Sequence, residues 1–207
     1  AGSVDPQADA VIARDGAAVL NTAFARAFPV WERFRRPKTE GLRLTLVGLG
    51  DVGGAILTGL VLLGESIAEI GVYDAYAPLM ERYRLELNQV LPTRDGRTMP
   101  RIVPRSPETL FDCDVFLFAA TAGVPPVGSA VADVRMAQLE ANGRLVARYA
   151  RQAREAGFSG LFCEISDPVD QLARRAFLES NRAADGTLDF AGLLPEQVQG
   201  FGLGVMA

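Results

Sequence analysis

The chain has 207 residues, of which 49% are hydrophobic and 22% are charged. This composition supports one sizeable core and argues against wholesale disorder. The net charge of −4 argues against nucleic acid as the main partner, because a phosphate backbone favours clustered positive charge. The sequence contains no histidine, the commonest metal ligand and general acid/base, and we expect no metal site.

The two cysteines, Cys113 and Cys163, each lie in or beside an apolar run. We expect buried, reduced thiols rather than a disulfide framework. No apolar stretch is long enough to span a bilayer, and the first residues carry no basic signal-peptide region. The sequence therefore predicts a cytoplasmic protein without membrane contact.

Residues 1–41 differ from the rest of the chain and are expected to form an N-terminal helical extension. Apolar residues from Val11 to Phe24 follow roughly helical spacing and predict an amphipathic helix that ends near Pro29. The aromatic residues Phe28, Trp31 and Phe34 then alternate with arginines. Two interpretations are open. The helix packs on its own domain, or it is an arm that docks on another subunit through the aromatic cluster.

From residue 42 onward, strand-like and helix-like segments alternate. The predicted strands are 42–47, 67–73, 101–103, 114–120, 160–165 and 198–205. The predicted helices run from the glycines at 48–53 to about 63, and over 78–90, 133–156 and 168–178. The polar stretch 181–194 is expected to be an insertion. This alternation is typical of βαβ crossovers. It predicts an α/β fold with a doubly wound parallel sheet, a Rossmann fold of about six strands, over residues 42–207.

A glycine-rich turn connects the first predicted strand to the first helix of that domain. Gly48, Gly50 and Gly53 occupy the positions of a G-x-G-x-x-G motif, with Asp51 and Val52 inside it. The first glycine permits a tight turn, the second allows a pyrophosphate to approach the backbone, and the third allows close helix–strand packing. The helix N-terminus then offers free N–H groups to phosphate. These features predict a dinucleotide site.

Asp74 closes the second predicted strand, where this motif expects an acidic residue. A carboxylate at this position accepts hydrogen bonds from ribose hydroxyls and repels a 2′-phosphate. The cofactor predicted here is therefore NAD rather than NADP. The alternative role for Asp74 is to cap a local turn.

Several later stretches resemble the lactate/malate dehydrogenase family. They are AATAGVP at 119–125, RMAQLEANG at 135–143 with Asn142, SDPVD at 166–170, and the glycines at 200–202. The resemblance covers about residues 42–207. It implies that Ala120, Thr121, Ala122 and Gly123 line the cofactor and that Asp167 lies beside its nicotinamide. It also implies a homo-oligomer or a partner subunit.

The same resemblance assigns a catalytic role to Arg135, that of the mobile-loop arginine that polarises the carbonyl of a small 2-oxo acid. The alternative is an ordinary solvated arginine at the start of a helix. Other family features are absent. There is no histidine for proton transfer, Met206 stands at the position of the aspartate that orients it, and Asp167 replaces an asparagine.

Three hypotheses follow. The chain is the NAD(H)-binding domain of a lactate/malate dehydrogenase-like oxidoreductase of the 2-hydroxy acid class, whose catalytic half lies outside it. Alternatively, it is a non-catalytic NAD(H)-binding sensor or assembly subunit, or a structural domain that binds nothing. Because a missing general acid/base costs about 10²- to 10⁴-fold in rate, we expect no lactate or malate reaction from this chain alone.

Overall fold

Within the described residues, the protein forms a sheet of six parallel strands. The computed structural model describes residues 20–35, 39–92, 98–123 and 134–202, and the side chains of residues 134 and 135 lie outside this description. The strand order is β3-β2-β1-β4-β5-β6. The strands are β1 (Leu42–Val47), β2 (Ile67–Tyr73), β3 (Arg101–Pro104), β4 (Val115–Phe118), β5 (Leu161–Glu164) and β6 (Val198–Gly200). The predicted doubly wound Rossmann fold is confirmed.

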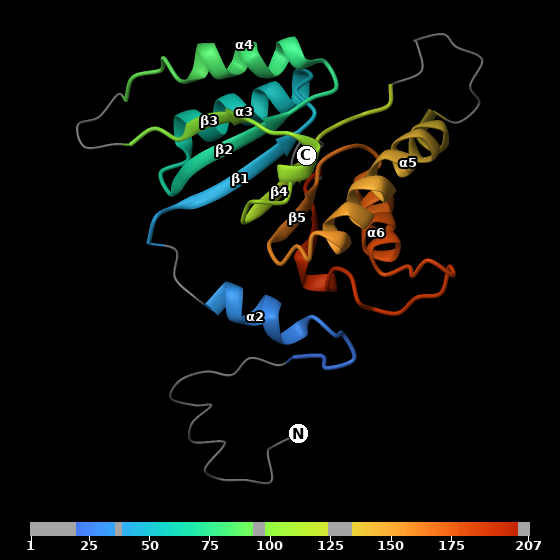
Figure 1. The fold of residues 1–207 in the computed structure, drawn as a ribbon. Coiled ribbons are helices and arrows are strands. Elements are labelled where there is room, and N and C mark those ends of the chain that lie inside the picture. Colours follow the sequence, from blue (N-terminus) through green and yellow to red (C-terminus); the bar gives the residue numbers. More distant parts are fainter. Residues whose placement is uncertain (1–19, 36–38, 93–97, 124–133, 203–207) are drawn as a thin grey trace.

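Helices cover both faces of this sheet (Figure 1). The covering helices are α3 (Asp51–Leu63), α4 (Ala77–Leu87), α5 (Val134–Glu155) and α6 (Val169–Ser180). Helix α2 (Ala27–Arg35) lies apart from both faces, and two short 3-10 turns, η1 (Pro107–Thr109) and η2 (Pro195–Gln197), complete the described elements. Helices α3 and α4 pack on one face over an aliphatic core that includes Leu46, Leu57 and Ile70. Helices α5 and α6 pack on the other face, where the core is rich in aromatic rings such as Phe116 and Phe162.

The strand register brings the carboxyl ends of the central strands to one edge. Val47, the last residue of β1, pairs with Tyr73 at the end of β2 and with Phe118 at the end of β4. Phe118 in turn pairs with Glu164 at the end of β5. The strand order reverses between β1 and β4, and ligands of open α/β sheets bind outside the carboxyl ends at such a switch point.

The prediction that a helix ends near Pro29 is wrong. In the structure α2 begins at Ala27 and continues to Arg35, with Pro29 in its first turn. Proline is tolerated there because the first turn does not use that backbone N–H. The residues before α2 form turns, in which the Ala23 N–H donates to Asn21 Oδ1 at 3.0 Å. The part of the prediction that falls on residues 1–19 lies outside the described residues.

The described part of the N-terminal segment packs on its own domain. Ala27 and Val30 of α2 are buried against Leu194. Arg26 donates to the Phe158 carbonyl at 2.9 Å, and Arg33 forms an ion pair with Asp114 at 2.5 Å. This is the first of the two arrangements considered from the sequence. The aromatic face of α2 nevertheless stays open, with Phe28 and Phe34 more than half exposed.

Two further predictions need correction or qualification. The last strand, β6, covers only Val198–Gly200 of the predicted 198–205, and residues 203–207 lie outside the described residues. The polar stretch 181–194 is not a peripheral insertion, because Asn181 and Leu193 are fully buried. Asn181 donates to the Leu193 carbonyl at 2.9 Å and so ties the end of α6 to this stretch. Within the described residues, no helix is long and apolar enough to cross a membrane, and no cluster of metal-ligating side chains occurs.

Candidate functional site: the carboxyl edge of the sheet

The glycine turn after β1 requires the absence of a side chain at its first position. Gly48 has a φ angle of +93°, a region that residues with a side chain rarely adopt. A Cβ atom here would lie 2.5 Å from the Ala120 Cα, on the segment that follows β4. The Gly48 N–H donates to the Tyr73 carbonyl at 2.9 Å. Gly48 therefore turns the chain while it lies between the ends of β2 and β4.

The other two glycines of the motif have opposite surroundings. A Cβ atom on Gly53 would lie 1.9 Å from the Gly48 carbonyl oxygen, so this glycine allows α3 to pack directly on the turn. A Cβ atom on Gly50 would meet nothing within 4 Å. Gly50 is the N-cap residue of α3, and no side chain caps the helix. The first N–H groups of a helix have no intrahelical acceptor, so those of Asp51, Val52 and Gly53 are donors beside open space.

Asp74 connects the end of β2 to the glycine turn. Its Oδ2 accepts a hydrogen bond from the Leu49 N–H at 2.8 Å, and its Oδ1 accepts one from the Tyr76 N–H at 2.8 Å. The side chain is half-buried. Each carboxylate oxygen has two lone pairs, so both oxygens can accept a further hydrogen bond. Asp74 thus holds the turn beside Gly50 and still offers a negatively charged acceptor. The hydrogen bond to the Tyr76 N–H also caps a local turn, the alternative role expected for Asp74.

Asn142, on α5, connects the segments that follow β4 and β5. Its side chain is 1% exposed. The Oδ1 atom accepts hydrogen bonds from the Ala122 N–H at 2.8 Å and from the Thr121 hydroxyl at 3.2 Å. The Nδ2 group donates to the Asp167 carbonyl at 2.9 Å. One buried amide therefore brings together two segments that lie 45 residues apart, and the resemblance placed both beside the cofactor.

Glu164 is a residue of this edge that the sequence analysis did not identify. It is the last residue of β5, and its side chain is fully buried. Its Oε1 accepts a hydrogen bond from the Ser166 N–H at 2.8 Å, whereas Oε2 has no hydrogen-bond partner among the described residues. Burial raises the pKa of this carboxyl well above its ordinary value. The available signal was the acidic residue inside the apolar run LFCEI.

Ser166 forms hydrogen bonds both to Glu164 and to the segment after β4. Its backbone N–H is held by Glu164, and its hydroxyl donates to the Ala120 carbonyl at 2.8 Å. The next peptide bond, between Asp167 and Pro168, is cis. The ends of β4 and β5 are therefore joined twice, by Ser166 and by Asn142.

Most of the predicted site residues meet at this edge of the sheet. The glycine turn, Asp74, residues 120–123 and Asp167 follow four neighbouring strands, and direct contacts join each segment to the next. Asp51 and Val52 lie exposed in the first turn of α3. Arg135 is the second residue of α5, and its side chain lies outside the described residues, as does Met206.

The fold and the glycine turn define a Rossmann-type α/β domain. No protein-family model matches the chain. Over 138 residues it is 28% identical to an L-lactate dehydrogenase of Treponema denticola, and over 135 residues it is 25% identical to one of Corynebacterium glutamicum. These matches cover 67% and 65% of the chain but only 41% and 40% of the relatives. The chain thus spans about two fifths of their length.

Solved structures give the same result for the fold. A minor L-lactate dehydrogenase from Enterococcus mundtii superimposes with a TM-score of 0.59 at 20% identity, over 72% of this chain and 45% of the other. A malate dehydrogenase from Plasmodium falciparum gives a TM-score of 0.53 at 22% identity, over 67% and 41%. The resemblance seen in the sequence is confirmed: over about two thirds of its length, the chain is similar in sequence to L-lactate dehydrogenases and in fold to lactate and malate dehydrogenases.

Proposed function

We propose that the chain binds NAD(H) at the carboxyl edge of its sheet. The observation that carries the proposal is the pairing of Asp74 with the glycine turn. A carboxylate that holds the Leu49 N–H lies beside a Gly50 with open space around it. The open space and the uncapped N-terminus of α3 suit a pyrophosphate. The free lone pairs of Asp74 suit ribose hydroxyls, and its charge disfavours the 2′-phosphate of NADP.

The other side of this edge suits the nicotinamide end of the cofactor. Residues 120–123 offer small side chains and backbone there, and Asn142 fixes them relative to Asp167. When bound, the cofactor would supply or accept a hydride. The role of the chain in this proposal is to hold the two ends of the dinucleotide at a fixed separation. We assign residues 42–207 to this NAD-binding domain and residues 1–41 to the N-terminal extension.

We further propose that the domain belongs to an oxidoreductase of the 2-hydroxy acid class, cytoplasmic and oligomeric, that acts on a small 2-oxo acid. The similarity to L-lactate and malate dehydrogenases supports this activity. The 207 residues contain no histidine, so proton transfer requires a group outside them or solvent. Arg135 is the residue proposed to polarise the substrate carbonyl.

The second candidate function is a non-catalytic NAD(H)-binding sensor or assembly subunit. It is favoured by Asp167 and Met206, which replace an asparagine and an aspartate that the resemblance leads us to expect. The exposed aromatic residues of α2 would then serve as the surface for a partner subunit.

Titration of NADH by its fluorescence tests the binding proposal. We expect Asp74→Ala to weaken binding about tenfold to a hundredfold, because a hydrogen bond to a charged group contributes about 1.5–3 kcal/mol. The matched control is Glu65→Ala, which removes an exposed carboxylate after α3 and leaves affinity unchanged. Asp74→Asn removes only the charge and should narrow the preference for NAD over NADP. An unchanged preference would contradict the assigned role of Asp74.

A second variant separates binding from folding. Gly50→Ser places a good N-cap residue at the start of α3, so the free energy of unfolding should stay the same or rise. The serine side chain would occupy the open space beside Gly50 and its N–H donors, and NADH binding should be lost. Normal binding by this variant would show that no phosphate lies beside Gly50.

Turnover distinguishes the two candidate functions. NADH oxidation is measured with pyruvate, oxaloacetate and related 2-oxo acids. Turnover that falls in Arg135→Ala, at unchanged NADH affinity, would support the enzyme. Binding without turnover would fit the sensor or assembly subunit and also a dehydrogenase whose catalytic half lies outside this chain, and absence of binding would leave only a structural role.

A further inference from the structure

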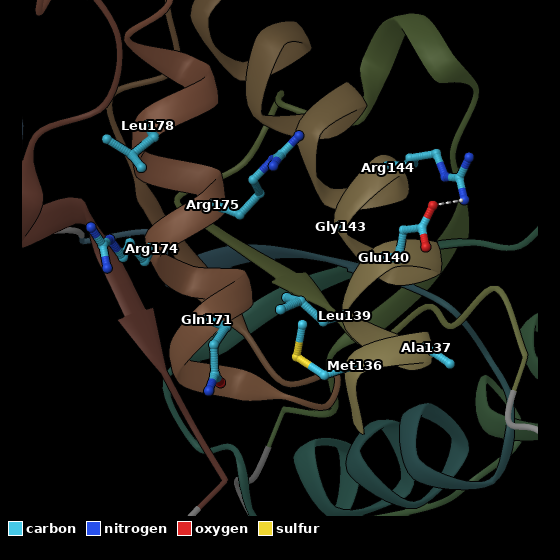
Figure 2. Close-up of a pocket in the computed structure, with 10 residues that line it drawn as sticks. All are labelled: Met136, Ala137, Leu139, Glu140, Gly143, Arg144, Gln171, Arg174, Arg175 and Leu178. Atoms are coloured by element: carbon cyan, nitrogen blue, oxygen red, sulfur yellow. Dashed lines mark hydrogen bonds and ion pairs between the residues drawn. The ribbon is translucent and has the colours of Figure 1, made fainter. Parts of the chain in front are cut away.

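A groove lies between α5 and α6, on the side of these helices that faces away from the sheet (Figure 2). Its volume is about 760 Å³. Its apolar lining includes Met136, Leu139 and Leu178, and Met136 is 59% exposed. The groove is separate from the glycine turn, because no residue of the turn lines it. An exposed apolar side chain within a groove is typical of a surface that another segment covers.

The groove carries a net positive charge. It is lined by Arg144, Arg174 and Arg175 against a single carboxylate, Glu140. Glu140 Oε1 forms an ion pair with Arg144 Nη2 at 2.9 Å, and Arg175 Nε lies 3.5 Å from Glu179 Oε1. Arg174 is exposed and forms no ion pair with the described part of the chain. A segment that is both apolar and acidic would therefore complement this groove.

The N-terminal segment of this chain approaches α6 beside the groove. The ring of Phe24 lies 6.2 Å from that of Phe177 in α6 and 5.4 Å from that of Phe190. Phe177 directly precedes Leu178, which lines the groove. Leu20, the first described residue, is four residues from Phe24 and so at most about 14 Å away.

Residues 1–19 have the composition that the groove requires. They contain three aspartates and one arginine, a net side-chain charge of −2, with apolar residues such as Val11 and Ile12 between them. The α5 side of the groove, from residue 136 to residue 144, is about 12 Å long. A segment of nineteen residues spans this length even as a helix, at about 28 Å. We propose that residues 1–19 dock in the α5/α6 groove of the same chain, with their aspartates against Arg174 and its neighbours.

Thiol labelling of the intact chain tests this docking. Cys113 and Cys163 are buried, so a cysteine introduced by Met136→Cys is labelled selectively. The matched control is Ser66→Cys, an exposed position after α3 and away from the groove. We expect a maleimide to label the Met136→Cys chain at least about tenfold more slowly than the control, which corresponds to about 1.4 kcal/mol of protection.

Substitutions that remove the charge complementarity between the groove and residues 1–19 should abolish the protection of Met136→Cys from maleimide. Arg174→Glu, or replacement of Asp5, Asp9 and Asp15 by asparagine, should raise the labelling rate of Met136→Cys to that of Ser66→Cys. Neither change should alter labelling of Ser66→Cys or the affinity for NADH. Equal rates in the parent background would overturn the proposal. Protection that increases with protein concentration would also overturn it, because the occupant would then be a second copy of the chain.

Discussion

The two halves of the sheet stabilise the same edge by different physical means. In the half formed by β1, α3 and β2, the turn depends on residues without side chains. Gly48 and Gly53 allow backbone segments to approach closely, and Asp74 binds backbone N–H groups. In the half formed by β4, α5, β5 and α6, buried polar side chains connect segments that are distant in sequence. At this edge they are Asn142, Glu164 and Ser166.

This difference shows how the two halves respond to substitution. Gly48 and Gly53 in the first half do not tolerate an added side chain, because their nearest neighbours are backbone atoms that cannot move aside. A polar residue in the second half fails when its partners lose a hydrogen bond, because a buried polar group without a partner costs free energy. The four predictions below test this contrast, from the largest expected effect to the smallest.

The largest effect is expected for Gly48→Ala. Alanine is strained at a φ of +93°, and its Cβ would lie 2.5 Å from the Ala120 Cα. We expect a loss of more than about 3 kcal/mol in the free energy of unfolding, measured with urea. The matched control is Gly59→Ala inside α3, where a Cβ meets nothing within 4 Å; it should gain about 0.5–1 kcal/mol. Similar urea midpoints for the two variants would contradict the role given to Gly48.

A smaller loss is expected for Asn142→Leu, which keeps the approximate size of the side chain. It removes the hydrogen bonds to the Ala122 N–H and to the Asp167 carbonyl, and the expected cost is about 2 kcal/mol. The control is Gln89→Leu, an exposed amide two residues after α4, which should change stability by less than about 0.5 kcal/mol. Equal effects in urea unfolding would show that Asn142 does not connect the two segments.

Glu164→Gln should change the dependence of stability on pH. Burial raises the pKa of Glu164 in the folded chain, so the folded state binds its proton more tightly than the unfolded state does. The stabilisation is complete below the ordinary glutamate pKa of about 4.3, and it is lost as the pH rises toward the folded value.

Urea unfolding across pH 4 to 8 measures this dependence. Glu164→Gln should lack the parent's loss of stability with rising pH, whereas Glu155→Gln, at an exposed position, should retain it. A parallel loss in all three proteins would mean that Glu164 ionises freely in the folded state.

The smallest effect is expected for the native thiols. Burial raises the pKa of Cys113 to about 11 and that of Cys163 to about 12. At pH 8 the thiolate fraction of Cys113 is therefore about a thousandth. We expect no reaction of either cysteine with a thiol reagent in the native protein, and reaction of both in urea. Both cysteines belong to the second half, so rapid labelling of either one without denaturant would show that this half of the sheet opens locally.

Much of the β1–α3–β2 half was predictable from residues close together in the sequence. Gly48, Gly50 and Gly53 occur in one short motif, and the apolar strand before them fixes where the turn lies. Asp74 follows the next strand directly, so its place at the same edge follows from the parallel register. The helix near Pro29 was placed wrongly because the apolar spacing before it also suits turns packed against Phe177 and Phe190.

The second half could be predicted only in outline. The resemblance placed residues 120–123 and Asp167 near the cofactor, but the sequence did not show that the Asn142 amide connects them. Glu164 was missed because an acidic residue in an apolar run gives no indication of its partners, which here include the Ser166 N–H. The burial of Asn181 was missed because a polar stretch normally predicts an exposed loop.

The sequence by itself determined the class of fold, the alternation of strands and helices and the position of the glycine turn. These follow from hydrophobic periodicity and backbone sterics, which act over a few residues. Only the tertiary structure decided which polar groups are buried, which segments Asn142 and Glu164 hold, and that α2 packs against Leu194. These features depend on contacts between residues that are far apart in the sequence. Such residues meet only when the chain has folded, so local sequence patterns do not reveal their hydrogen bonds or apolar contacts.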